Sequence, residues 1–130
     1  AIITITPATE PILQADWIKP GTHISAVGAD MPGKQEIASA LDANARLFVD
    51  DRAQSISSGE LEVPVKEGAI TPNDIVAELG EVIAGTTRGR TDSGQVTVFD
   101  TSGIAIQDLA ASKAAYDRAV EHKLGSVVEL

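Results

Sequence analysis

The chain has 130 residues, enough to bury a hydrophobic core without a disulfide or a metal ion to hold the fold together. Its 19 acidic and 10 basic side chains give a net charge of −9, which repels phosphate backbones and anionic lipid, so we expect no nucleic-acid partner and no membrane partner. The absence of cysteine excludes disulfide frameworks, thiolate zinc sites and cysteine nucleophiles, and it is consistent with a cytoplasmic location.

The first fifty residues predict short strands that alternate with helical segments. The run at residues 2–6 is apolar and β-branched, which favours a strand, and Pro7 ends it. Because the chain opens inside a core strand, we expect it to be a piece of a longer protein. The other predicted elements of this half are a helical turn at 14–18, strands at 22–27 and 46–49, a turn at 28–33 and a helix at 36–45.

The second half of the chain predicts two helices before the last strand. Asp50 or Asp51 can cap a helix that starts at Arg52 and that Gly59 ends. Another helix is predicted over 71–84, from a favourable start and an apolar face at helical spacing. The start consists of Thr71, Pro72 and Asp74, the face consists of Ile75, Leu79, Val82 and Ile83, and Gly85 is the stop.

A strand, a tight turn and a long helix complete the predicted elements. We expect the strand over 95–99, the turn over 100–103 and the helix over 104–123, with Gly125 as its stop. The alternation of buried strands with helices predicts an α/β fold, with a parallel sheet covered by helices. The apolar stripe of the long helix consists of Leu109, Tyr116, Val120 and Leu124.

Three segments directly follow predicted strands, at residues 7–9, 28–30 and 101–103, and parallel sheets bind ligands at the carboxyl ends of their strands. In the second segment Asp30 lies between apolar Ala29 and Met31. Partial burial there would raise its pKa and let it transfer protons near neutral pH. The alternative is that Asp30 only caps the following turn, and spacing alone favours this alternative.

Hydroxyl-bearing residues surround two of these segments. Thr4, Thr6 and Thr9 could bind the ribose or phosphate of a nucleotide, although ordinary strand threonines are the more frequent explanation. Residues 100–103 offer hydroxyls and backbone N–H groups before a helix, where an anion or a carboxamide can bind. A simple N-cap explains the same residues.

The remaining polar residues predict no further site. His23 is expected to pack inside a strand, and His122 to lie in the last turn of the long helix, where a positive charge suits the helix dipole. Asp50 and Asp51 form an acidic pair, but no further ligand follows at a useful spacing, so we predict no metal site. The sequence lacks the G-x-G-x-x-G loop that a complete dinucleotide-binding domain carries in its first half.

Five blocks of the sequence, which together cover essentially the whole chain, resemble the ornithine cyclodeaminase/mu-crystallin family. They are ITITPATEPIL, HISAVGADMPGKQEI, RLFVDDRAQSISSGEL, ITPNDIVAELGEVIAG and VTVFDTSGIAIQDLAA. The resemblance implies a Rossmann-like parallel sheet, with residues 1–103 as the second half of an NAD(P)-binding domain. It also implies that residues 104–130 form a C-terminal helix that returns to an N-terminal substrate and dimerisation domain outside this sequence.

The resemblance also implies roles for individual residues. Asp30 matches the acid/base carboxylate of the cyclodeaminases, which mu-crystallin-like members lack. The basic residues that bind the substrate carboxylate lie in the part of the family that precedes this sequence. The implied cofactor contacts are Thr6, Pro7 and Ala8 after the first strand, Val27 and Gly28 near the nicotinamide ribose and ring, and Thr101, Ser102 and Gly103 over the nicotinamide.

The implied activity is that of an NAD(P)-dependent amino-acid or imine oxidoreductase or cyclodeaminase, inactive without the rest of the protein. The cyclodeaminase reaction converts L-ornithine to L-proline and ammonia, whereas the oxidoreductase oxidatively deaminates an L-amino acid. The cofactor is NAD or NADP, the small-molecule partner is an amino acid or an imine, and the complete enzyme is expected to be a homodimer. The alternative, from another class, is a non-catalytic, stand-alone α/β binding or interaction module.

Overall fold

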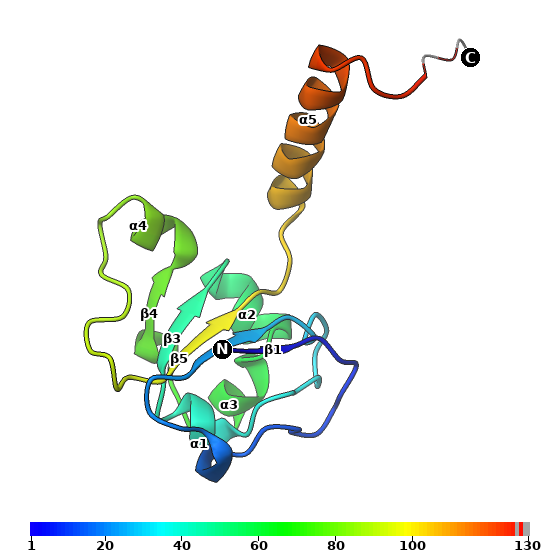
Figure 1. Ribbon diagram of the computed structural model, residues 1–130. Helices are drawn as coiled ribbons and strands as arrows, with labels where there is room; N and C mark the ends of the chain where they lie inside the picture. Colours follow the sequence, from blue (N-terminus) through cyan, green and yellow to red (C-terminus); the bar gives the residue numbers. More distant parts are fainter. Residues whose placement is uncertain (127, 129–130) are drawn as a thin grey trace.

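The computed structural model describes residues 1–126 and 128 as a sheet with short helices around it and one long helix that extends away from it (Figure 1). The strands are β1 (Ile2–Thr4), β2 (His23–Ala26), β3 (Arg46–Val49), β4 (Ile75–Glu78) and β5 (Thr97–Asp100). Their order in the sheet is β1-β2-β5-β3-β4, and all neighbouring strands are parallel. The predicted α/β fold with a parallel sheet is therefore confirmed.

The α-helices of the described residues are α1 (Ser39–Asp42), α2 (Arg52–Ser58), α3 (Glu62–Lys66), α4 (Leu79–Ile83) and α5 (Ala105–Glu121). The predicted long helix is confirmed as α5, but none of its residues is buried, so its apolar stripe faces solvent. Residues 127, 129 and 130, which end the predicted C-terminal segment, lie outside the described residues. No helix in the described part of the chain is both long and apolar enough to cross a membrane.

The hydrophobic core lies on one face of the sheet. The parallel register aligns Ile24 of β2 and Leu47 of β3 with Val98 of β5, so that branched side chains from three adjacent strands meet. Leu41 of α1 and Leu61 cover them, and all five residues are at most 3% exposed. This packing holds β2, β5 and β3 side by side at the centre of the sheet.

The helix predicted over 71–84 is wrong in its first part, where the structure forms strand β4, and only Leu79–Ile83 are α-helical, as α4. The start sequence makes a short 3-10 turn (Pro72–Asp74), in which the Asp74 carboxylate accepts the N–H and the O–H of Thr71 at 2.7 and 2.8 Å. Ile75 and Ala77 are then buried while Val76 and Glu78 are half-buried, which is the alternation of a strand. Pairing with β3 therefore overrides the local helical signal.

The helix predicted over 36–45 is shorter than expected, since α1 spans only Ser39–Asp42. The backbone N–H groups of Glu36 and Ile37 donate instead to the buried side chain of Glu60, at 2.8 and 2.6 Å. A long-range contact thus replaces the first turn of the predicted helix.

Candidate functional site

Three strand ends meet at one edge of the sheet, because β1, β2 and β5 are neighbours and parallel. The backbone N–H of Val27 donates to the carbonyl of Thr4 at 2.9 Å, and that of Thr101 donates to the carbonyl of Ala26 at 3.0 Å. These bonds connect each strand-end segment to the strand beside it. The structure therefore brings together the residues that the sequence singled out: Thr6, Pro7, Ala8, Val27, Gly28, Thr101, Ser102 and Gly103.

Glu36 joins the first two of these segments, and the sequence did not predict this role. Its carboxylate accepts the N–H and O–H of Thr6 at 2.6 and 2.8 Å, the O–H of Thr4 at 2.7 Å and the N–H of Gly28 at 2.9 Å. Burial acts to raise the pKa of this fully buried carboxyl, but the hydrogen bonds from Thr4, Thr6 and Gly28 outweigh burial and lower the pKa. Glu36 is therefore ionised at neutral pH.

Gly28 is a glycine because the protein itself fills the space beside it. A Cβ atom at this position would lie 2.3 Å from the carbonyl oxygen of Thr6 and 2.5 Å from a carboxylate oxygen of Glu36. Any side chain would push the end of β2 away from the end of β1. The close approach expected at Gly28 is thus made by the chain's own backbone and by Glu36.

Asp50, at the end of β3, organises the third segment. Its carboxylate accepts the hydroxyls of Thr101 and Ser102 at 3.0 Å and the N–H of Gly103 at 2.9 Å. The adjacent Asp51 is the cap of α2, because its side chain accepts the N–H of Gln54 at 2.8 Å. Residues 100–103 are therefore not a simple N-cap. They form a loop that a carboxylate from the neighbouring strand holds.

The raised pKa expected at Asp30 is wrong. Ala29 is buried, but the Asp30 side chain is 59% exposed and forms an ion pair of 2.5 Å with Lys34, four residues further along the chain. The hydrogen bond from the Lys34 ammonium, and then its charge, lower the pKa of Asp30. Asp30 is accordingly a carboxylate at neutral pH, and Lys34, which is only 18% exposed, is its partner.

The other candidates lie away from this edge or beneath it. Thr4 is buried under Glu36, whereas Thr9 is exposed.

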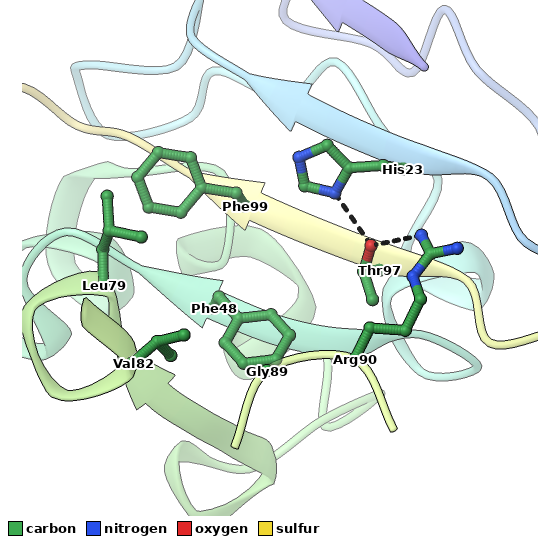
Figure 2. Close-up of a pocket in the computed structure, with 8 residues that line it drawn as sticks. All are labelled: His23, Phe48, Leu79, Val82, Gly89, Arg90, Thr97 and Phe99. Carbon is green, nitrogen blue, oxygen red and sulfur yellow. Dashed lines mark hydrogen bonds between the residues drawn. The ribbon is translucent and has the colours of Figure 1, made fainter. Parts of the chain in front are cut away.

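His23 is exposed rather than packed, and its Nδ1 lies 2.8 Å from the Thr97 hydroxyl. It lines a hollow of about 420 Å³ on the sheet face opposite the core, beside Phe99 of β5 (Figure 2). Burial and the charge of Arg90 lower the pKa of His23.

His122 is exposed and is the C-cap of α5. No group of His, Cys, Asp or Glu among the described residues is arranged to hold a metal ion.

Residues 6–8, 27–28 and 101–103 carry no charged side chain and present backbone groups, hydroxyls and small side chains. Ala8 and Gly103 are small, and no described atom outside Gly103 and its chain neighbours lies within 4 Å of the position that a Cβ of Gly103 would occupy. Backbone groups and small side chains allow a flat ring and a ribose to approach closely. Lys34 is paired with Asp30 rather than directed at a phosphate. These segments therefore suit a flat ring and a sugar better than a phosphate.

Comparison with known proteins relates the whole chain to one family. The model of the ornithine cyclodeaminase/mu-crystallin family matches residues 1–123. The chain is 42% identical to an alanine dehydrogenase of Archaeoglobus fulgidus over 128 residues, and 43% identical to an iminosuccinate reductase of Paracoccus denitrificans over 129 residues. These matches cover 98% and 99% of this chain but 40% of each relative, so the chain spans about two fifths of the length of these proteins.

Solved structures agree with this relationship. An archaeal alanine dehydrogenase dimer with bound NAD superposes with a TM-score of 0.91 and 42% identity, over 99% of this chain and 41% of that one. A Delta(1)-pyrroline-2-carboxylate reductase of Thermococcus litoralis, in complex with NADH and L-proline, gives a TM-score of 0.91 and 36% identity, over 98% of this chain and 40% of that one. On sequence and on fold, this chain belongs to the ornithine cyclodeaminase/mu-crystallin family.

Proposed function

We propose that this chain is part of an NAD(H)-dependent oxidoreductase that interconverts an L-amino acid and its imine. The observation that carries the proposal is the meeting of three strand ends, held together by Glu36 and Asp50, in a chain whose solved relatives bind NAD or NADH. Residues 6–8, 27–28 and 101–103 form the wall for the nicotinamide and its ribose. Asp30 lies beside this wall, at the end of the segment after β2.

The division of the chain follows from the same proposal. Residues 1–103 are part of the NAD(H)-binding domain, and residues 104–130 are the segment that returns to the N-terminal substrate and dimerisation domain of the complete protein. The exposed apolar side chains of α5, such as Leu109 and Tyr116, support this division, because a helix that packs against another domain needs such a stripe. We propose a homodimer for the complete enzyme, as the archaeal alanine dehydrogenase forms a dimer.

Asp30 is the group of this chain that handles a proton. When bound, NAD⁺ would accept the hydride that leaves the α-carbon of the amino acid. Asp30 is ionised and exposed, so its carboxylate can take the proton that the substrate nitrogen loses as the imine forms. In the opposite direction the protonated Asp30 returns that proton to the nitrogen. Lys34 keeps the carboxylate charged between turnovers.

A cyclodeaminase reaction is the second candidate. The chain is 40% identical to a protein of Sinorhizobium fredii that is described as an uncharacterised cyclodeaminase. In that reaction the imine is attacked by the side-chain amine of ornithine, ammonia leaves, and the hydride returns to give proline. Ammonia release from L-ornithine without net formation of NADH would select this candidate, whereas NADH formed in proportion to an amino acid selects the oxidoreductase.

Replacement of Asp30 tests the proposal in the complete protein. Asp30→Asn should reduce turnover by at least ~100-fold, because general acid/base catalysis typically contributes that much, while the Kd for NAD⁺ stays within about twofold. Steady-state rates and calorimetry give the two numbers. The matched control is Asp117→Asn on α5, which removes another exposed carboxylate paired with a lysine four residues away and should leave turnover unchanged. Full turnover in Asp30→Asn would reject the assignment.

A further inference from the structure

The carboxylate of Glu36 lies directly behind the two strand ends that the proposed function places against the nicotinamide. None of this residue is exposed, so Glu36 cannot touch a bound cofactor. No Lys, Arg or His among the described residues forms an ion pair with it. Its negative charge is balanced instead by N–H and O–H donors of Thr4, Thr6 and Gly28.

The backbone of Glu36 is itself fixed from two sides. Its N–H donates to both carboxyl oxygens of Glu60, at 2.8 and 3.0 Å. Its carbonyl accepts the N–H groups of Ile12 and Leu13, at 2.9 and 3.1 Å. The Glu36 side chain therefore projects from a fixed backbone, and its carboxylate oxygens determine where the ends of β1 and β2 lie.

We propose that Glu36 is a positioning residue for the cofactor: its carboxylate fixes the end of β1 against the end of β2 and so sets the shape of the wall that receives the nicotinamide and ribose. The inference rests on the proposed function, because it supposes that NAD(H) binds at this edge. Glu36 acts only through Thr6 and Gly28, which carry the backbone of the wall.

A carboxylate is required because each of its two oxygens serves two donors. One oxygen accepts both groups of Thr6, and the other accepts Thr4 and Gly28. An amide has a single oxygen, so Glu36→Gln would turn an NH₂ group towards N–H and O–H donors. A buried N–H facing another donor is unsatisfied and repelled, whereas hydrogen bonds to an ionised group are the stronger ones.

Two measurements on the complete protein test the inference. In Glu36→Gln, the amide protons of Thr6 and Gly28 should exchange with solvent at least ~10-fold faster than in the wild type, and the Kd for NAD⁺ should rise at least ~10-fold. The control is Asp42→Asn, which also replaces a fully buried carboxyl by an amide but makes no hydrogen bond to either strand end. This control should keep the wild-type exchange rates at both amides and the wild-type Kd.

Thr4→Val is the second variant, in case Glu36→Gln does not fold. Valine keeps the shape of buried Thr4 and removes only its hydroxyl, which donates to Glu36 at 2.7 Å. We expect faster exchange at Thr6 and Gly28 and a several-fold weaker affinity for NAD⁺. Faster exchange with an unchanged Kd in a folded variant would overturn the inference and leave the proposed function intact. A wild-type protein that binds no NAD(H) would instead overturn the proposed function.

Discussion

At the scale of single residues, the site depends on ionised carboxylates whose partners keep them charged. Glu36 is held by neutral donors inside the protein, whereas Asp30 is held by the Lys34 ammonium at the surface. In the proposed function the two environments separate two roles, because only the exposed carboxylate of Asp30 can exchange a proton with a substrate. The charge state of Asp30 therefore depends on Lys34.

Replacement of Lys34 should change the charge state of Asp30. In Lys34→Gln, the pKa of Asp30 should rise towards its ordinary value, because the hydrogen bond and the charge that lower it are both lost. The acidic limb of the kcat/KM profile should then move to higher pH, and NMR titration of the Asp30 carboxyl should show the same displacement. Lys113→Gln, which breaks the comparable pair with Asp117, is the control. An acidic limb that does not move would show that another group controls it.

The sequence predicts which strand ends come together better than it predicts the residues that hold them together. Apolar β-branched runs predict β2 and β3, and the tendency of ligands to bind at the carboxyl ends of parallel strands selects residues 28–30 and 101–103. Glu36 escapes this reasoning because its donors Thr4 and Thr6 are 32 and 30 residues away in sequence. An acidic residue in a predicted helix normally indicates a solvent-facing position, so only the folded chain shows its role.

At the scale of secondary-structure elements, neighbouring strands stabilise one another's loops. The loop after β5 is held by Asp50 from β3 and by Gln54 of α2, whose side-chain amide donates to the carbonyls of Ser102 and Gly103. β4 shows the same dependence on neighbours. Its residues Ile75–Glu78 follow a strong helix start, and pairing with β3 makes them a strand. The local pattern cannot reveal this pairing, because the apolar positions of a four-residue segment fit both the helical and the strand periodicity.

Removal of the Asp50 charge should loosen the loop over residues 101–103. Asp50→Asn leaves one acceptor oxygen for four donors, the three of residues 101–103 and the backbone N–H of Asp51, so we expect a loss of about 1–3 kcal/mol in the free energy of unfolding and faster amide exchange at Gly103. Denaturant titration and hydrogen exchange measure the two effects. Asp51→Asn is the control, because asparagine caps a helix about as well as aspartate. Unchanged exchange at Gly103 in Asp50→Asn would contradict the role given to Asp50.

At the scale of the whole molecule, a group of buried acids makes stability depend on pH. Asp42, Glu60 and Asp100 are each at most 1% exposed, and no Lys, Arg or His of the described residues pairs with them. Burial raises the pKa of Glu60 to about 8 and that of Asp100 to about 7, and it raises the pKa of Asp42 as well. Glu36 and Asp50, the charged groups beside them, add repulsion.

The protein should therefore lose stability as the pH rises from about 4 to about 8. A carboxyl whose pKa is higher in the folded state than in the unfolded state binds more protons when folded, so its contribution is complete at low pH and is lost as the pH passes its folded pKa. Carboxyls with lowered pKa values, such as Asp30 and Asp74, change stability only below about pH 4.5.

Thermal unfolding at about pH 5.5 and about pH 8.5 checks this prediction, and the Tm should be lower at the higher pH. Asp42→Asn removes one of the buried acids and should reduce the difference between the two Tm values. Asp117→Asn, at an exposed position, should not alter it. A Tm that stays constant or rises between the two conditions would contradict the protonation of this group.

The outer edge of β1 has a consequence for the chain when no other protein segment covers that edge. Within the described residues this strand pairs with β2 alone, so its outer backbone N–H and C=O groups have no strand partner. Beside that edge, Ile3 and Ile5 are 71% and 72% exposed. An unpaired edge with β-branched side chains is a template for adding another strand, which is how soluble proteins begin to aggregate. An isolated chain therefore carries an aggregation risk next to the strand end that Glu36 fixes.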